Sequence, residues 1–266
     1  MKRALPAVLV VAAAAAALAF LVLPIVTIFL RVPPGHLLHQ LSSPVVTDAL
    51  IVSFKTTAIA QVLILVFGTP LAWLLASRRF RGRGLAITLV ELPLVLPPAV
   101  AGLGLLTAFG RMGLLETNIA FTQTAVVLAI AFVSSPLYIR PAMAAFEGVD
   151  PNLIAASRTL GAGPGRTFFR VVLPLGRNGL AAGEALAFAR GLGEFGATIM
   201  FAGSLQGVTQ TLPLAIYSAF AIDFDTALAM GALLVVVSIV LLLFLKLVLS
   251  WRSSAPTSSF LSARST

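Results

Sequence analysis

Apolar residues gather in six stretches of this chain, separated by shorter polar segments. Each stretch reaches the roughly 20 residues that a helix needs to cross a bilayer. Their approximate bounds are residues 5–30, 49–77, 85–109, 119–139, 179–203 and 226–250. The pattern predicts an all-α, polytopic membrane protein with about six transmembrane helices. We expect residues 1–252 to form a single transmembrane domain and the serine-rich tail, 253–266, to be disordered.

The first apolar stretch follows Met1-Lys2-Arg3 and has the look of a secretory signal. It is longer than the apolar core of such a signal and long enough to span a bilayer. We interpret it as the first transmembrane helix, with a cleaved alanine-rich leader as the alternative.

Composition supports the membrane class. The mean hydropathy is +1.05, and only 10% of the residues are charged, which leaves a soluble domain no polar surface. The chain has no cysteine, so disulfides, cysteine-ligated metals and thiol catalysis are excluded. The net charge of +9 does not indicate nucleic-acid binding, because the basic residues flank apolar spans.

The basic residues are distributed unequally between the two sides of the membrane. With a cytoplasmic N-terminus, the outer loops hold Arg31 and Arg111, and Lys55 and Arg190 fall within spans. The other fourteen of the 18 basic residues lie on the cytoplasmic side. Loops of membrane proteins that are rich in Lys and Arg stay on the cytoplasmic side. Both termini and the loop of about residues 140–177 are therefore predicted to be cytoplasmic.

Two spans have unusual composition. The third contains Pro93, Pro97 and Pro98, which remove backbone donors. It is either a broken helix inside the bundle or along a pore, or a kinked packing helix, and the sequence favours neither. The fifth carries Gly183, Ala187 and Gly191 at four-residue spacing, followed by Gly193 and Gly196. Such a stripe predicts a central helix at a helix–helix or subunit interface.

The polar loop before the fifth span has the pattern of two short helices. Asp150 and Pro151 suit the N-cap and first position of a helix over residues 152–160, which Gly161 and Gly163 end. We expect a second helix over residues 166–172, stopped at Pro174. The simplest interpretation is a solvated basic loop, but the ordered helix–glycine–helix pattern favours a docking element.

The chain carries no catalytic motif. Neither the P-loop sequence Gly-x-x-x-x-Gly-Lys-Ser/Thr nor the metalloprotease sequence His-Glu-x-x-His is present. We therefore predict that the chain is no enzyme and binds no cofactor of its own. Energy for any active transport comes from a partner.

The loop resembles the EAA motif of binding-protein-dependent ABC importer permeases. Ala156 and Ser157 stand at its two alanine positions, Gly161 at its glycine, and Val171 and Leu173-Pro174 at its Ile-x-Leu-Pro end. Ala155 departs from the motif, which has glutamate there. The resemblance implies a coupling helix seated in a cleft of an ATPase subunit. The residues expected to form it are Ala155, Ala156, Ser157, Arg158, Leu160, Gly161, Val171, Leu173 and Pro174.

A second stretch is similar to molybdate importer permeases. It comprises residues 187–198, AFARGLGEFGAT, and residues 209–217, TQTLPLAIY. The resemblance implies an inner-membrane permease of a bacterium or archaeon that moves an oxyanion through a homodimeric pore. Its implied partners are ABC ATPase subunits that use ATP and Mg, a periplasmic or lipid-anchored oxyanion-binding protein, a second copy of itself and membrane lipid.

The same stretch supplies the candidates for the translocation path or for helix packing, Arg190, Gly193, Glu194, Gly196 and Thr198. Arg190 and Glu194 are four residues apart, so on one helix they form a pair. A structural ion pair is favoured over contact with the substrate, and a packing role is favoured for Thr198. Charged groups in a membrane face protein or water.

The remaining ionisable residues have ordinary interpretations. Glu91 and Glu184 lie near cytoplasmic ends of their spans, and Lys55 near an outer end, where its ammonium reaches the interface. His36 and His39 lack further ligands, so no metal site is predicted. Alternatives for the whole chain are a sulfate, thiosulfate or tungstate permease, a secondary transporter or channel without an ATPase, and a membrane scaffold.

Overall fold

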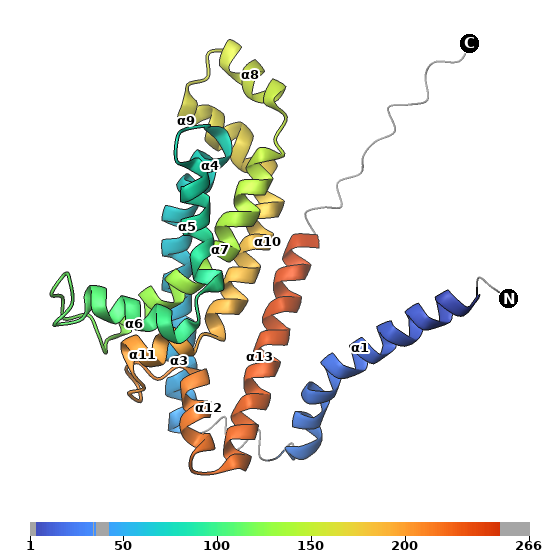
Figure 1. Cartoon of the computed structure of the whole chain (residues 1–266), viewed down its shortest axis with the longest axis vertical. Coiled ribbons are helices and arrows are strands. Elements are labelled where there is room, and N and C mark those ends of the chain that lie inside the picture. Colours follow the sequence, from blue (N-terminus) through green and yellow to red (C-terminus); the bar gives the residue numbers. More distant parts are fainter. Residues whose placement is uncertain (1–3, 34, 36–42, 251–266) are drawn as a thin grey trace. The chain divides into compact units, whose positions relative to one another are not determined.

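A computed structural model describes residues 4–33, 35 and 43–250, with side chains placed for 9–33, 35 and 43–243. Within these ranges the chain is helical and contains no strand. Figure 1 shows the helices coloured along the sequence. The chain divides into two compact units. Unit 1 comprises the chain up to Ala60, Leu96–Val133 and Gly191–Ser238. Unit 2 comprises Gln61–Val95, Ser134–Arg190 and the chain from Ile239.

Four of the six predicted spans are long apolar helices. They are α1 (Ala4–Arg31), a segment built from α3 (Pro44–Leu63), η1 (Ile64–Gly68) and α4 (Thr69–Ser77), α7 (Gln123–Glu147), and α13 (Phe224–Ser250). The π-helical turn η1 stands just before Pro70. A widened turn accommodates a proline, which lacks an N–H and crowds the preceding turn. These four spans confirm the hydropathy prediction, although α7 extends eight residues beyond its predicted end.

The third predicted span is broken. It consists of α5 (Arg83–Val95) and α6 (Pro98–Phe109), which together are apolar enough for one crossing. Pro97 caps α6 in an extended conformation, with φ −54° and ψ 131°. The structure shows that the helix is broken, with α5 and α6 bent by 115°, whereas the predicted place inside the bundle or along a pore stays a prediction. Proline at the start of α6 loses nothing, because the first N–H groups of a helix have no partner within it.

The fifth predicted span is not one continuous helix, so that prediction is wrong. α10 (Leu173–Leu192) ends before Gly193, and α11 (Gly196–Ala202) begins three residues later. The break consists of Gly193, Glu194 and Phe195, and apolar residues on both sides of it keep the stretch span-like in hydropathy. Among the described residues, four helices are long and apolar enough to span, or five with the broken α5–α6 pair.

In unit 1, α6 and α11 pack at backbone distance. A Cβ on Gly102 of α6 would lie 2.5 Å from the carbonyl oxygen of Ala197 in α11. A Cβ on Gly196 would lie 2.7 Å from the Cβ of Pro98. Glycine on both helices therefore allows this contact, as the small-residue pattern of the fifth span predicted.

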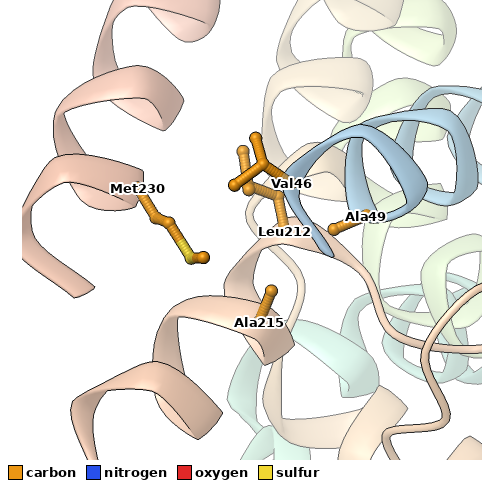
Figure 2. Close-up of a cluster of buried hydrophobic side chains, with 5 residues drawn as sticks. All are labelled: Val46, Ala49, Leu212, Ala215 and Met230. Carbon is orange, nitrogen blue, oxygen red and sulfur yellow. The ribbon is translucent and has the colours of Figure 1, made fainter. Parts of the chain in front are cut away.

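Unit 1 also contains a helix that the sequence did not predict. α12 (Leu212–Phe220) lies between the predicted fifth and sixth spans. Its Leu212 and Ala215 are buried against Val46 and Ala49 of α3 and Met230 of α13 (Figure 2). The backbone N–H of Leu212 donates to Ser53 Oγ of α3 at 2.8 Å. The nine-residue α12 is thus held in place by the helices on both sides.

In unit 2, glycines of α10 lie against α7. A Cβ on Gly179 would lie 2.5 Å from the Cβ of Ala145, and one on Gly183 would lie 3.1 Å from the carbonyl oxygen of Tyr138. Tyr138 is fully buried and shares a 2.6 Å hydrogen bond with Thr69 of α4. The predicted close approach of the fifth span to another helix is confirmed for Gly183.

The α6–α11 contact generates a test with a matched control. Gly102→Ala places a methyl group against backbone, which cannot swing aside, so we expect destabilisation of about 1–3 kcal/mol. Gly104→Ala on the same helix meets nothing within 4 Å and is expected to leave stability unchanged or slightly raised. Thermal unfolding of the detergent-solubilised variants distinguishes them. Equal melting temperatures would contradict the packing described.

Candidate functional site

The loop between α7 and α10 contains the predicted short helix, α8 (Pro151–Thr159). Asp150 caps it by accepting a 2.8 Å hydrogen bond from the backbone N–H of Asn152. At the other end Gly161 has φ +80°, and the N–H of Ala162 donates to the carbonyl of Ser157. This is the glycine-dependent helix stop expected from the sequence. The predicted cap at Asp150 and stop at Gly161 are confirmed, and the helix itself begins and ends one residue earlier than predicted.

The second predicted helix does not stop at Pro174. α9 (Pro164–Thr167) leads into the π-helical η2 (Phe168–Val172), which continues as α10 (Figure 1). The N–H of Leu173 reaches back to the carbonyl of Phe168. This wider turn accommodates Pro174 without ending the helix. The prediction treated proline as a terminator, whereas here the chain changes its helical pitch instead.

One hydrogen bond joins α8 to α9, and aromatic contacts just after α9 pack the chain against α4 and α7. The Ser157 and Thr167 hydroxyls lie 3.0 Å apart and share a hydrogen bond. Phe168 stacks against Trp73 of α4 and Phe146 of α7, with ring centroids 5.6 and 5.9 Å apart. Trp73 and Phe146 are themselves 5.7 Å apart, edge to face. Each such aromatic pair contributes about 0.5–1.5 kcal/mol beyond its buried area.

An arginine that the sequence did not single out joins the helices beneath α8. Nε of Arg83 donates to the carbonyl oxygen of Leu75 at 2.7 Å, near the end of α4. Its Nη2 donates to Oε1 of Glu147 at 2.7 Å, at the end of α7. Arg83 thereby satisfies a carbonyl that the helix end leaves open. No local pattern signals this bridge, because Arg83 and Glu147 are 64 residues apart.

α8 has two different faces. Leu153, Ala156 and Leu160 form an exposed apolar stripe, with Leu153 48% and Leu160 88% exposed. Ile154 and Arg158 lie on an adjacent face and line a cavity within unit 2. We call the first stripe the exposed face of α8. The sequence grouped Arg158 with Leu160 as coupling residues. In the structure Arg158 lines the cavity, whereas Leu160 belongs to the exposed face.

The other predicted coupling residues are distributed along the segment. Ala155 is exposed, as is Pro174, whereas Val171 and Leu173 are half-buried. Val172 between them is fully buried. Ala155, Ala156 and Leu160 are thus exposed at α8. Val171, Leu173 and Pro174, at the end of the motif, lie where η2 continues into α10.

The second candidate region is the break between α10 and α11. Glu194 is 1% exposed, and its Oε1 accepts a 2.8 Å hydrogen bond from the N–H of Ala197. A carboxylate is stabilised there by the helix N-terminus. Glu194 lies outside α10, so the premise that it shares one helical face with Arg190 is wrong. Its described contact is with backbone, and the role of Arg190 and Glu194 as a structural pair stays a prediction.

The remaining candidates of this region have mixed positions. Thr198 is fully buried in α11, and its hydroxyl makes no hydrogen bond among the described residues, so it is not bonded to its own helix. Gly193 is exposed, while Gly196 lies against α6. Arg190 is half-buried near the end of α10. Whether these residues contact a transported ion stays a prediction.

The other ionisable residues are also accounted for where they are described. Lys55 donates to Gln123 Oε1 at 2.9 Å, and Glu91 pairs with Arg140 at 2.8 Å. His36 and His39 lie outside the described residues, as does the tail 253–266. Within the described part of the chain, no group of three or more His, Cys, Asp or Glu residues is placed to hold a metal ion.

Comparison with known sequences gives one family and a consistent set of relatives. The family described as "Binding-protein-dependent transport system inner membrane component" matches residues 68–253. The molybdenum transport system permease protein ModB of Mycobacterium bovis is 45% identical over 239 residues, covering 86% of this chain and 90% of the relative. ModB of Escherichia coli is 41% identical over 212 residues, covering 77% and 92%.

Solved structures with the same fold are membrane transporters. A bacterial alginate ABC transporter, in complex with an alginate pentasaccharide-bound periplasmic protein, matches with a TM-score of 0.71 at 17% identity. The match covers 96% of each chain. The MetNI methionine ABC transporter in inward-facing conformations matches with a TM-score of 0.62 at 18% identity, covering 79% of this chain and 95% of that one.

Proposed function

Because this chain belongs to the family of binding-protein-dependent transport system inner membrane components, we propose that it is the permease subunit of an ATP-driven molybdate importer. Its relatives from Mycobacterium bovis and Escherichia coli are molybdenum transport system permeases, and the sequence match covers most of the length of each. The chain has no P-loop, so ATP and Mg belong to a separate ATPase subunit. The permease itself binds no cofactor in this proposal.

The observation that carries the proposal is the exposed face of α8. The helix is capped at both ends and joined to α9 through Ser157, and the Phe168 that follows α9 packs against Trp73. Even so, Leu153 and Leu160 remain exposed. Full burial of one leucine side chain stabilises a complex by about 1.5–3 kcal/mol. A rigid helix with an unburied apolar stripe is suited to a cleft on a soluble partner. We assign that cleft to the ATPase.

Coupling then follows from the chain's connectivity. α8 and α9 continue through η2 into α10, so a displacement of α8 by the ATPase reaches the fifth span along covalent structure. The charge distribution orients the chain with both termini and α8 in the cytoplasm. Closure of two ATPases on two copies of this chain would open their shared pore outward, a two-state change biased from a distant site.

The permease is expected to bind molybdate weakly. Within the spans, the guanidinium of Arg140 is already paired with Glu91 at 2.8 Å, which leaves less positive charge there for an anion. Backbone donors and hydroxyls are sufficient for an ion that passes through. Selectivity between molybdate, tungstate and sulfate would then belong mainly to the binding protein that delivers the ion from outside the cell.

The substrate assignment is tested by reconstitution with the ATPase and the binding protein. Binding protein loaded with molybdate is expected to stimulate ATP hydrolysis more strongly than the same protein loaded with sulfate. The unloaded binding protein is the control. Equal stimulation by the two anions would contradict the molybdate assignment and leave the permease assignment standing.

The coupling role is tested at Gly161. Its φ of +80° costs a residue with a side chain about 1–2 kcal/mol, so Gly161→Val is expected to reorient the end of α8. A Cβ there meets nothing within 4 Å, so the effect is conformational. Gly163→Ala is the control, because Gly163 has φ −67° and equally open space.

Molybdate uptake into vesicles, normalised to inserted permease, is the measurement. We expect uptake to fall severalfold in Gly161→Val and to be retained in Gly163→Ala. Normal uptake by the valine variant would refute the role given to the α8 stop.

A further inference from the structure

A cavity of about 530 Å³ lies within unit 2 and is bounded on one side by α8. Its walls come from the end of α4, the end of α7 and the α8–α9 segment. The lining residues used here are Trp73, Arg78, Phe146, Glu147, Ile154 and Arg158. The volume falls within the roughly 300–1,000 Å³ typical of small-molecule sites.

The charge of the cavity is positive. Arg78 and Arg158 line it from different walls, and neither forms an ion pair among the described residues. The carboxylate of Glu147 is already paired with Arg83 at 2.7 Å. Two guanidinium groups thus remain for an anion, and guanidinium binds phosphate oxygens with matched, two-pronged geometry.

One wall of the cavity is aromatic. Trp73 and Phe146 line it and contact each other edge to face at 5.7 Å. Free phosphate makes no use of such a wall, whereas the glycerol and upper acyl groups of a phospholipid do. The ligand favoured by the lining is therefore an anion with an attached apolar part.

The order of residues along the chain places this cavity at a membrane surface. Trp73 lies near the end of the second span, and the basic run Arg78, Arg79, Arg81 and Arg83 follows at once. Tryptophan is enriched at the headgroup level, and clustered basic residues just inside a span attract anionic lipid.

We propose that this cavity binds an anionic phospholipid of the cytoplasmic leaflet, with its phosphate between Arg78 and Arg158. One arginine follows α4 in the membrane domain, and the other is on the coupling helix. A bound lipid would therefore link α8 to α4 and make its position sensitive to the lipid composition. The site does not depend on which solute the chain carries.

The test uses Trp73 as the reporter. The chain has two tryptophans, so Trp251→Phe leaves Trp73 alone. In this background, phosphatidylglycerol brominated near the ester end of its acyl chains is expected to quench fluorescence more than phosphatidylcholine brominated at the same place. Arg78→Gln is expected to weaken the anionic preference about fivefold, the equivalent of about 1 kcal/mol for one basic residue.

Arg79→Gln is the matched control. It removes the same charge one residue further along the chain, at a position that does not line the cavity. It is expected to keep the preference. Arg78→Lys retains the charge and is expected to keep most of it, which separates loss of the site from loss of the fold. Equal quenching by the two lipids, or equal losses in the Arg78→Gln and Arg79→Gln variants, would overturn the proposal.

A final arm distinguishes lipid from a soluble anion. The preference is measured again in excess inorganic phosphate and in chloride of the same ionic strength. Retention of the preference in both supports a lipid occupant. Its loss in phosphate alone would show that the cavity selects the free ion and would overturn the lipid assignment.

Discussion

Close contact between helices at glycine residues is the feature on which both units depend. In a membrane, moving an apolar side chain from lipid into a helix contact gains little free energy, because both surroundings are apolar. Helices therefore associate through tight packing and hydrogen bonds. Gly102 and Gly196 bring α6 and α11 to backbone distance in unit 1, and Gly179 and Gly183 do the same for α10 and α7 in unit 2. Broken helices are tolerated in a membrane only where protein or water surrounds the break. The α6–α11 contact supplies such protein surroundings in unit 1.

The α8–α9 segment combines a fixed shape with an exposed apolar surface. Asp150, Gly161 and the Ser157–Thr167 hydrogen bond fix the shape of α8, while Leu153 and Leu160 stay exposed. A flexible loop would absorb a partner's movement, but a capped helix passes it on. In the proposed function, the aromatic contacts of Phe168 and the continuous helix from α9 to α10 would carry that movement into the spans.

Features set by local sequence were predictable. Hydropathy located four spans, and Asp150 and Gly161 marked both ends of α8, because capping depends on neighbours in the chain. The break at Gly193, Glu194 and Phe195 was missed because the four-residue spacing of Arg190 and Glu194 also fits one continuous helix. The helix through Pro174 was missed because a π-helical turn has no simple sequence signal. The Arg83–Glu147 bridge and the aromatic contacts beneath α8 join residues far apart in sequence, so only the fold reveals them.

The central claim is that the exposed face of α8 is the contact with the ATPase, and site-specific cross-linking tests it most directly. The chain has no cysteine, so Leu160→Cys introduces a single thiol at a position 88% exposed. Leu114→Cys, at a position 87% exposed in a predicted outer loop, is the control. The account predicts that a heterobifunctional thiol reagent joins the ATPase to position 160 and not to position 114 in the assembled transporter. Equal labelling at the two positions, or none at position 160, would contradict it.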